Sequence, residues 1–195
     1  MENVVLLVVP FLSDYDKIHL LETCHRFNQF KFSITYTDKY KARKIANLPY
    51  NFAKVKAKFP RDLEFNRHPI THLRITEPVE IPKSVVKLSV ERNFQITIPD
   101  TVRSVTFCDD FNKPVILPNK LISVDFGIRF NKPVVLPNTI KKAWFDDRFN
   151  QNIILPEGIE DIMFGLNFNK PVVLPSNVKY ANFMHNFNQP LTIPD

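Results

Sequence analysis

A 19-residue repeat fills the C-terminal half of this 195-residue chain and constrains its fold more than any other feature. The proline of an Ile/Leu-Pro step recurs at positions 99, 118, 137, 156, 175 and 194, and a Phe-Asn pair recurs at the same interval. A period of this size indicates a solenoid, in which each repeat is one coil that buries its apolar side chains only against neighbouring coils.

The first regular repeat, residues 99–117, predicts the shape of one coil. Val105-Thr106-Phe107 alternates apolar and polar side chains, which is typical of a short strand. Pro114–Leu117 predicts a second extended segment, because two prolines in 19 residues disfavour a helix. Equivalent positions then stack from coil to coil as a parallel sheet around repeated ladders. The expected structural ladders are Phe107, Phe126, Phe145, Phe164, Phe183; Phe111, Phe130, Phe149, Phe168, Phe187; and Asn112, Asn131, Asn150, Asn169, Asn188.

The Phe-Asn pair is expected at a corner of each coil. Asn tolerates left-handed backbone better than most residues, so it would turn the chain in place of glycine. The composition, with 18 Phe and 16 Pro but only 3 Gly, follows from this repeat, because every Phe and Pro from residue 99 onward lies in a repeat column.

The repeat also sets the predicted domain boundaries. Residues 99–195 hold five regular copies, and residues 69–98 hold degenerate copies that keep aliphatic columns but lose residues. The unit P-x-x-V-x-x-V-x-F-x-x-x-F-N-x-P-V resembles the FNIP repeat, a relative of the leucine-rich repeat found in giant viruses and slime moulds. The resemblance implies a β-rich, leucine-rich-repeat-like solenoid with a parallel sheet. A parallel β-helix with coils of similar length is the alternative architecture.

The N-terminal residues follow a helical period after a cap at Ser13 or Asp14. The string LSDYDKIHLLETCHRFNQF resembles the central and C-terminal part of an F-box, so residues 1–30 are predicted to form a small, N-terminally incomplete helical region of that type. Residues 31–68 are a connecting segment for which the sequence predicts no fold. The resemblance implies docking to the adaptor subunit of a cullin-RING (SCF-type) ubiquitin ligase through Val5, Leu7, Phe11, Leu12, Ile18 and Leu21.

A protein-binding face is predicted on the outward positions of the repeated strands. These positions vary while the inward columns repeat, as in solenoids that display a variable face on a constant scaffold. Trp144, Met163 and Tyr180 have the composition of an interface anchor. The full predicted partner-binding face is Thr106, Asp125, Lys142, Trp144, Asp161, Met163, Tyr180 and Asn182.

Enzyme chemistry has no signature in this sequence. No nucleophile, base or metal-ligand set is grouped, and the predicted catalytic, cofactor and metal sites are therefore none. The leading functional hypothesis is a non-enzymatic adaptor, the substrate-recognition subunit of a ubiquitin ligase. The alternatives are a plain protein-binding solenoid with a decayed F-box and, more weakly, nucleic-acid binding through the basic segment 39–58.

Three further expectations concern the environment of the chain. The two cysteines are too few for a disulfide framework, and the apolar run of residues 4–12 is too short to span a bilayer, so an intracellular, cytoplasmic or nuclear location is expected, in the host cell if the protein is viral. No membrane partner is expected. The last coil carries no polar cap, which predicts self-association through its exposed edge.

Overall fold

The computed structural model describes residues 13, 15, 35–41, 51–57 and 70–192. The chain divides into two compact units, with a boundary between residues 71 and 72, and residues 58–60 are assigned to the second unit. The first unit contributes β1 (Thr35–Lys41) and β2 (Asn51–Ala57), which pair in parallel with a register shift between Tyr36 and Lys39. The connecting segment thus contains strands that the sequence did not predict.

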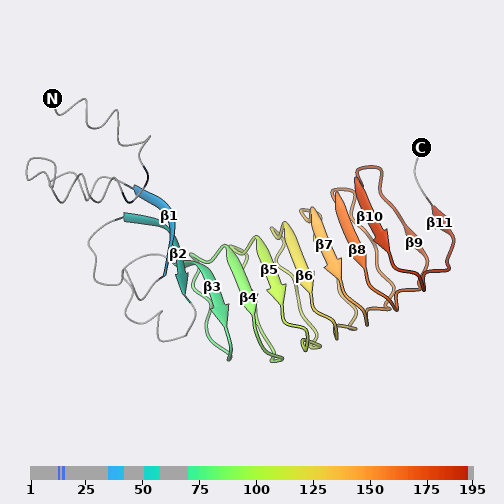
Figure 1. Cartoon of the computed structure of the whole chain (residues 1–195), viewed down its shortest axis with the longest axis horizontal. Coiled ribbons are helices and arrows are strands. Elements are labelled where there is room, and N and C mark those ends of the chain that lie inside the picture. The colour runs from blue at the N-terminus through green and yellow to red at the C-terminus, as the bar shows by residue number, and fades with distance from the viewer. Residues whose placement is uncertain (1–12, 14, 16–34, 42–50, 58–69, 193–195) are drawn as a thin grey trace, which may run out of the picture. The chain divides into compact units, whose positions relative to one another are not determined.

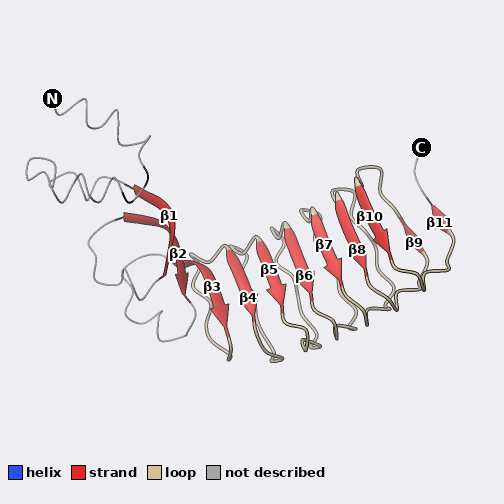
Figure 2. Cartoon of the chain, viewed as in Figure 1, coloured by secondary structure: helices blue, strands red, loops and turns tan. Residues whose placement is uncertain are grey.

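The repeats of the second unit form a solenoid with one short strand in each coil. In Figure 1 these strands stand side by side and point the same way, and Figure 2 shows the loops that return the chain from one strand to the next. The strands are β3 (Ile70–Ile75), β4 (Lys87–Val90), β5 (Ser104–Phe107), β6 (Ser123–Phe126), β7 (Lys142–Phe145), β8 (Asp161–Phe164) and β10 (Tyr180–Phe183). The predicted solenoid with a parallel sheet is confirmed.

The register of the sheet reproduces the sequence repeat. Val105 pairs with Val124, Val124 with Ala143, and Ala143 with Ile162, so every step between regular strands is 19 residues. On the return side of the coils, the predicted extended segments alternate buried and exposed residues. A second short sheet forms only in the last two of these described segments, between β9 (Val172–Val173) and β11 (Leu191–Thr192). Prolines begin most of these segments, and proline has no N–H to donate to a ladder.

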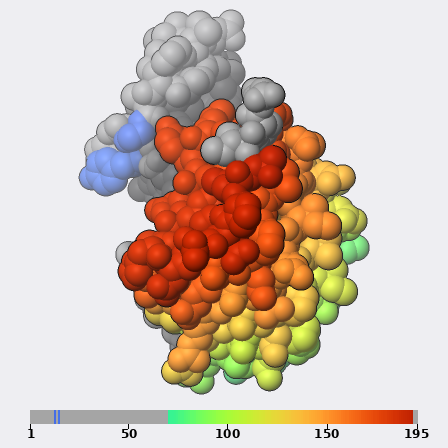
Figure 3. All heavy atoms as spheres, turned by 90° about the vertical axis from the view of Figure 1, so that its right-hand side faces the viewer, coloured from blue at the N-terminus to red at the C-terminus, as the bar shows by residue number. Residues whose placement is uncertain are grey.

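Two phenylalanine ladders fill the interior between the strand side and the return side. Neighbouring rings in the first ladder lie 5.1–5.6 Å apart, and those in the second lie 6.0–6.1 Å apart. The ladders also stack on each other, with the Phe126 and Phe130 centroids 4.0 Å apart. Viewed along the array, successive coils lie behind one another (Figure 3), so each ring is covered by the coils before and after it. Each buried ring contributes about 1.5–3 kcal/mol of hydrophobic stabilisation.

The corners of the coils differ from the sequence-based expectation. One turn follows each Ile/Leu-Pro step, where the proline carbonyl accepts from the N–H three residues later, as in the bond from Leu121 N to Pro118 O. The other turn ends at the Phe of the Phe-Asn pair, as in the bond from Phe130 N to Gly127 O. No described residue has a positive φ angle, so the prediction of left-handed Asn at the corner was wrong. Turns without left-handed residues need neither Gly nor Asn at their centre.

The Asn column instead forms a continuous hydrogen-bond ladder just after the second turn. The side-chain oxygen of each Asn accepts the backbone N–H of the Asn one coil later, over 2.9–3.1 Å. The ladder begins at Asn93, which precedes Phe94 in a degenerate coil and supplies the acceptor for Asn112. Asn is selected here because its short side chain carries a carbonyl acceptor to the neighbouring backbone.

Replacing Asn150 by alanine is expected to lower the free energy of unfolding by about 1 kcal/mol, because the N–H of Asn169 loses its acceptor while partly accessible to water. Asn150→Asp keeps an acceptor oxygen at the same reach and should retain most of the stability. Urea denaturation followed by circular dichroism measures both variants. Equal losses for alanine and aspartate would contradict an acceptor role for this column.

Candidate protein-binding face

The predicted partner residues lie together on the outward side of the sheet. They come from β5, β6, β7, β8 and β10, at outward positions that alternate with buried ones. The register places Asp125 beside Trp144, and Trp144 beside Met163. Asn182 lies beside Met163 on the next strand. We call this surface of Thr106, Asp125, Lys142, Trp144, Asp161, Met163, Tyr180 and Asn182 the strand face.

Trp144 is the centre of the strand face and is held in position by its neighbour. Its indole Nε1 donates a hydrogen bond to Asp161 Oδ1 over 3.2 Å. The other oxygen of Asp161 lies 3.5 Å from Lys142 Nζ, so the two predicted charged residues pair with each other. A shallow hollow lies between Trp144, Met163 and Tyr180, and Tyr180 is 72% exposed. The arrangement offers a fixed aromatic plane beside an accessible phenol.

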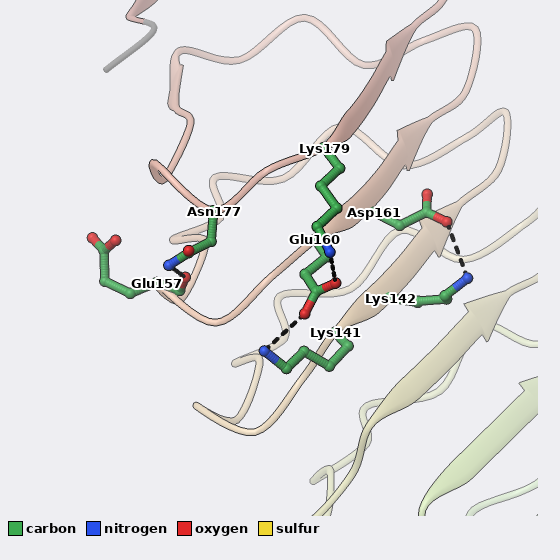
Figure 4. A network of polar contacts seen from close by, with 7 residues as sticks. All are labelled: Lys141, Lys142, Glu157, Glu160, Asp161, Asn177 and Lys179. Atoms are coloured by element: carbon green, nitrogen blue, oxygen red, sulfur yellow. Dashed lines mark hydrogen bonds and ion pairs between the residues drawn. The ribbon is translucent and has the colours of Figure 1, made fainter. Parts of the chain in front are cut away.

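A charged cluster borders the strand face at the start of the strands (Figure 4). Glu160 accepts from Lys179 Nζ over 2.7 Å and from Lys141 Nζ over 3.0 Å. The bond from Lys179, followed by that from Lys141, lowers the pKa of Glu160 from 4.5 to about 2, and Glu160 raises the pKa of Lys179. A depressed carboxylate pKa stabilises the fold above pH 4.5 and loses that effect as the pH falls towards 2. The gain is small because the groups are exposed.

Three carboxylates gather at the other end of the strands. Partial burial raises the pKa of Asp125, and the charges of Asp146 and Asp109 raise it further. Burial likewise raises the pKa of Asp146, with a smaller contribution from Asp109. The strand face therefore carries lysines at one end and carboxylates at the other. Such polarity orients a charged partner along the strands.

The return side of the coils carries an exposed row that sequence reasoning missed. Ile116, Val135, Ile154 and Val173 recur at 19-residue steps and are 90%, 86%, 89% and 65% exposed, respectively. They alternate with buried residues such as Val115 and Leu117. The sequence signal was the aliphatic residue two positions after the second proline column, which was assigned to the interior with its neighbours.

The remaining sequence-based sites fall elsewhere. The predicted adaptor-binding residues Val5, Leu7, Phe11, Leu12, Ile18 and Leu21 lie outside the described residues. In the basic segment, the β1–β2 register pairs the backbone of Lys39 with Lys54 and of Lys41 with Lys56. Within the described ranges, no group of three or more metal-ligating side chains is found, and no helix is long and apolar enough to cross a membrane.

Comparison with known proteins supports the repeat assignment. No protein-family model matches the chain. An FNIP repeat-containing protein of Acanthamoeba polyphaga mimivirus is 28% identical over 56% of this chain and 38% of the relative. The chain is similar to an FNIP repeat protein.

A solved structure shows the same type of fold. The crystal structure of CroV588, described as a novel circular leucine-rich-repeat protein, matches with a TM-score of 0.53 and 21% identity. The match covers 79% of this chain and 36% of that protein. The chain therefore spans little more than a third of the length of either protein, and the leucine-rich-repeat-like architecture is the common element.

Proposed function

We propose that this chain is a non-enzymatic protein-binding solenoid that recognises a partner protein through its strand face. The observation that carries the proposal is the grouping of Trp144, Met163 and Tyr180 over a constant scaffold. Aromatic and Met side chains are enriched at interface cores, and a few such anchors carry most of the binding free energy. Because the core columns repeat beneath them, these outward residues differ between coils without disturbing the fold.

The electrostatics of the strand face support a partner of defined orientation. Lys142 and Asp161 neutralise each other beside Trp144, so the centre of the face presents little net charge to a partner. The lysines near Glu160 and the carboxylates near Asp125 lie at opposite ends of the strands. A partner that matched both ends would bind in one direction.

A site-specific crosslinking experiment tests this proposal. A photoreactive amino acid at position 180 should capture a partner protein from eukaryotic cell extract, whereas the same group at the exposed position 120 should not. Trp144→Ala in the same chain should remove the captured band, while Thr106→Ala at the far end of the face should preserve it. Equal capture from positions 180 and 120 would contradict a role for the strand face.

We further propose that the recognised protein is a substrate for a cullin-RING ubiquitin ligase, with this chain as its substrate-recognition subunit. The support is the F-box resemblance of residues 1–30, placed before a protein-binding array. Co-purification with the ligase adaptor subunit is the expected result, and Leu12→Asp should abolish it. If the adaptor does not co-purify, or if Leu12→Asp makes no difference, the chain is a plain protein-binding solenoid.

Nucleic-acid binding is the second candidate function, favoured by one observation. The β1–β2 register sets the backbone positions of four lysines next to one another in two pairs. Binding through these lysines would weaken steeply with salt, because phosphate contacts release counterions. Filter binding with random-sequence RNA and DNA at low salt tests it, and Lys54→Glu should reduce retention. No retention at low salt would remove this candidate.

A further inference from the structure

We propose a second docking surface on the return side of the coils, which binds an acidic amphipathic helix of a partner protein. The surface is the row Ile116, Val135, Ile154 and Val173, here called the aliphatic row. It goes beyond the proposed function because it faces away from the strand side: the inward residues of the two sides, such as Val105 and Leu117, share the same buried core.

The aliphatic row is a bounded patch, although its column runs through the whole array. The equivalent positions before and after it are Thr97 and Thr192, so the four central coils alone carry aliphatic side chains there. Exposed prolines widen the patch at Pro114, Pro133 and Pro171. Contiguous exposed apolar patches of this kind mark interaction sites more often than isolated surface residues do.

The patch is also hollowed. One hollow is lined by residues of the coils around Ile116, Val135 and Ile154, and another by residues around Ile154 and Val173. The two hollows share Ile153 and Ile154, and so they form one continuous shallow trough along the row. A trough accepts a ridge of side chains better than a flat surface does.

The charge beside the aliphatic row identifies the partner. Lys113, Lys132 and Lys170 lie three residues before Ile116, Val135 and Val173, about 10 Å away in extended backbone. These lysines form no ion pair with any residue that the structure describes, whereas Lys141, Lys142 and Lys179 on the strand side are all paired. An apolar trough with a basic edge complements an apolar ridge with an acidic edge. A second copy of the chain would bring like charges together.

The spacing of the aliphatic row favours a helix over a strand. Neighbouring coils are separated by about 4.8 Å, the distance between paired strands, so three steps span about 14 Å. A helix advances 5.4 Å per turn, and ten residues rise about 15 Å. Its side chains at i, i+3 or i+4, i+7 and i+11 therefore meet successive coils. An extended peptide repeats one face only every 6.6–6.8 Å and loses register with the coils.

A binding experiment with designed peptides tests the proposal. The probe is a fluorescein-labelled helical peptide of about 14 residues, with leucines along one face and glutamates on one flank, titrated into the full chain. Fluorescence anisotropy should report binding that weakens with salt. Ile154→Asp and Val135→Asp should each weaken it by about tenfold or more, the effect of losing one buried aliphatic contact. Lys132→Glu and Lys170→Glu should weaken it in proportion to the charge removed.

The controls separate this surface from the strand face and from a folding defect. Trp144→Ala should leave peptide affinity unchanged, so failure here would not bear on the proposed function. Because positions 135 and 154 are 86% and 89% exposed, circular dichroism and the melting temperature should stay near wild type. The proposal is overturned by equal binding of a scrambled peptide or of a lysine-substituted one, or by no binding of the acidic helix. Concentration-dependent dimerisation abolished by Ile154→Asp would also overturn it in favour of a second copy.

Discussion

Replacing Phe149 by alanine is expected to lower the free energy of unfolding by about 3–5 kcal/mol, the largest loss among the changes considered for this chain. The ring is 0% exposed and lies between Phe130 and Phe168 in its own ladder, with centroid distances of 6.1 and 6.0 Å. It also stacks on Phe145 of the other ladder at 4.0 Å. Truncation therefore removes contacts to three rings and leaves a cavity at the centre of the array.

The same column supplies a matched control. Phe187 occupies the equivalent position in the last described coil, where it is only half-buried. Phe187→Ala should cost much less than Phe149→Ala, because it removes less buried area and is covered on one side. Guanidinium denaturation followed by far-ultraviolet circular dichroism measures both. Equal losses at the two positions would show that ladder stacking does not determine stability, and an intact transition in Phe149→Ala would contradict the central role of the stacks.

Replacing Gly165 by alanine is expected to cost about 1–3 kcal/mol, although an alanine in a helix or loop normally stabilises relative to glycine. A Cβ atom here would overlap the backbone of the preceding coil at Asp146 and Asp147. Gly127 faces the same obstacle at Cys108 and Asp109. Backbone atoms cannot rotate aside as a flexible side chain can, so the two turns must separate and the hydrogen bond from Asn167 N to Asp147 O must lengthen.

Gly158 provides the comparison for this prediction. Its added Cβ would come within 2.9 Å of the Asn138 carbonyl oxygen, a smaller overlap, and the equivalent positions hold Thr139 and Asn177 in neighbouring coils. Gly158→Ala should therefore stay within about 0.5 kcal/mol of wild type. Thermal unfolding of the two variants side by side measures the difference. A Gly165→Ala protein as stable as Gly158→Ala would mean that the turns relax without cost.

The sequence was most informative where the repeat itself carries the signal. Phe126, Phe130 and Val124 were assigned to the interior from their columns, and all are buried. Equivalent positions in a solenoid have equivalent neighbours, so one correct assignment extends to every coil. Grouping of the strand face followed from the same rule, because outward positions on neighbouring strands must lie side by side.

The expectations that failed concern positions where periodicity does not determine backbone conformation. Asn131 recurs as faithfully as Phe130, yet recurrence alone could not distinguish a left-handed corner from a side chain that accepts a hydrogen bond. Its oxygen accepts from Asn150 N of the next coil and from Gln151 Nε2, and both donors are 19–20 residues away in sequence. The role of the column thus depends on contacts between coils that do not exist in a single repeat.

The aliphatic row shows the same division between sequence and structure. By itself, the sequence determined the 19-residue coil, the parallel sheet and the identity of the two phenylalanine ladders, because burial of apolar columns requires coils to stack in phase. The tertiary structure alone decided that Val115 points inward while Ile116 is exposed, and that Gly165 lies against the backbone of the coil before it. Side-chain direction and coil-to-coil approach depend on the rotation of each extended segment, which is set by packing across the core.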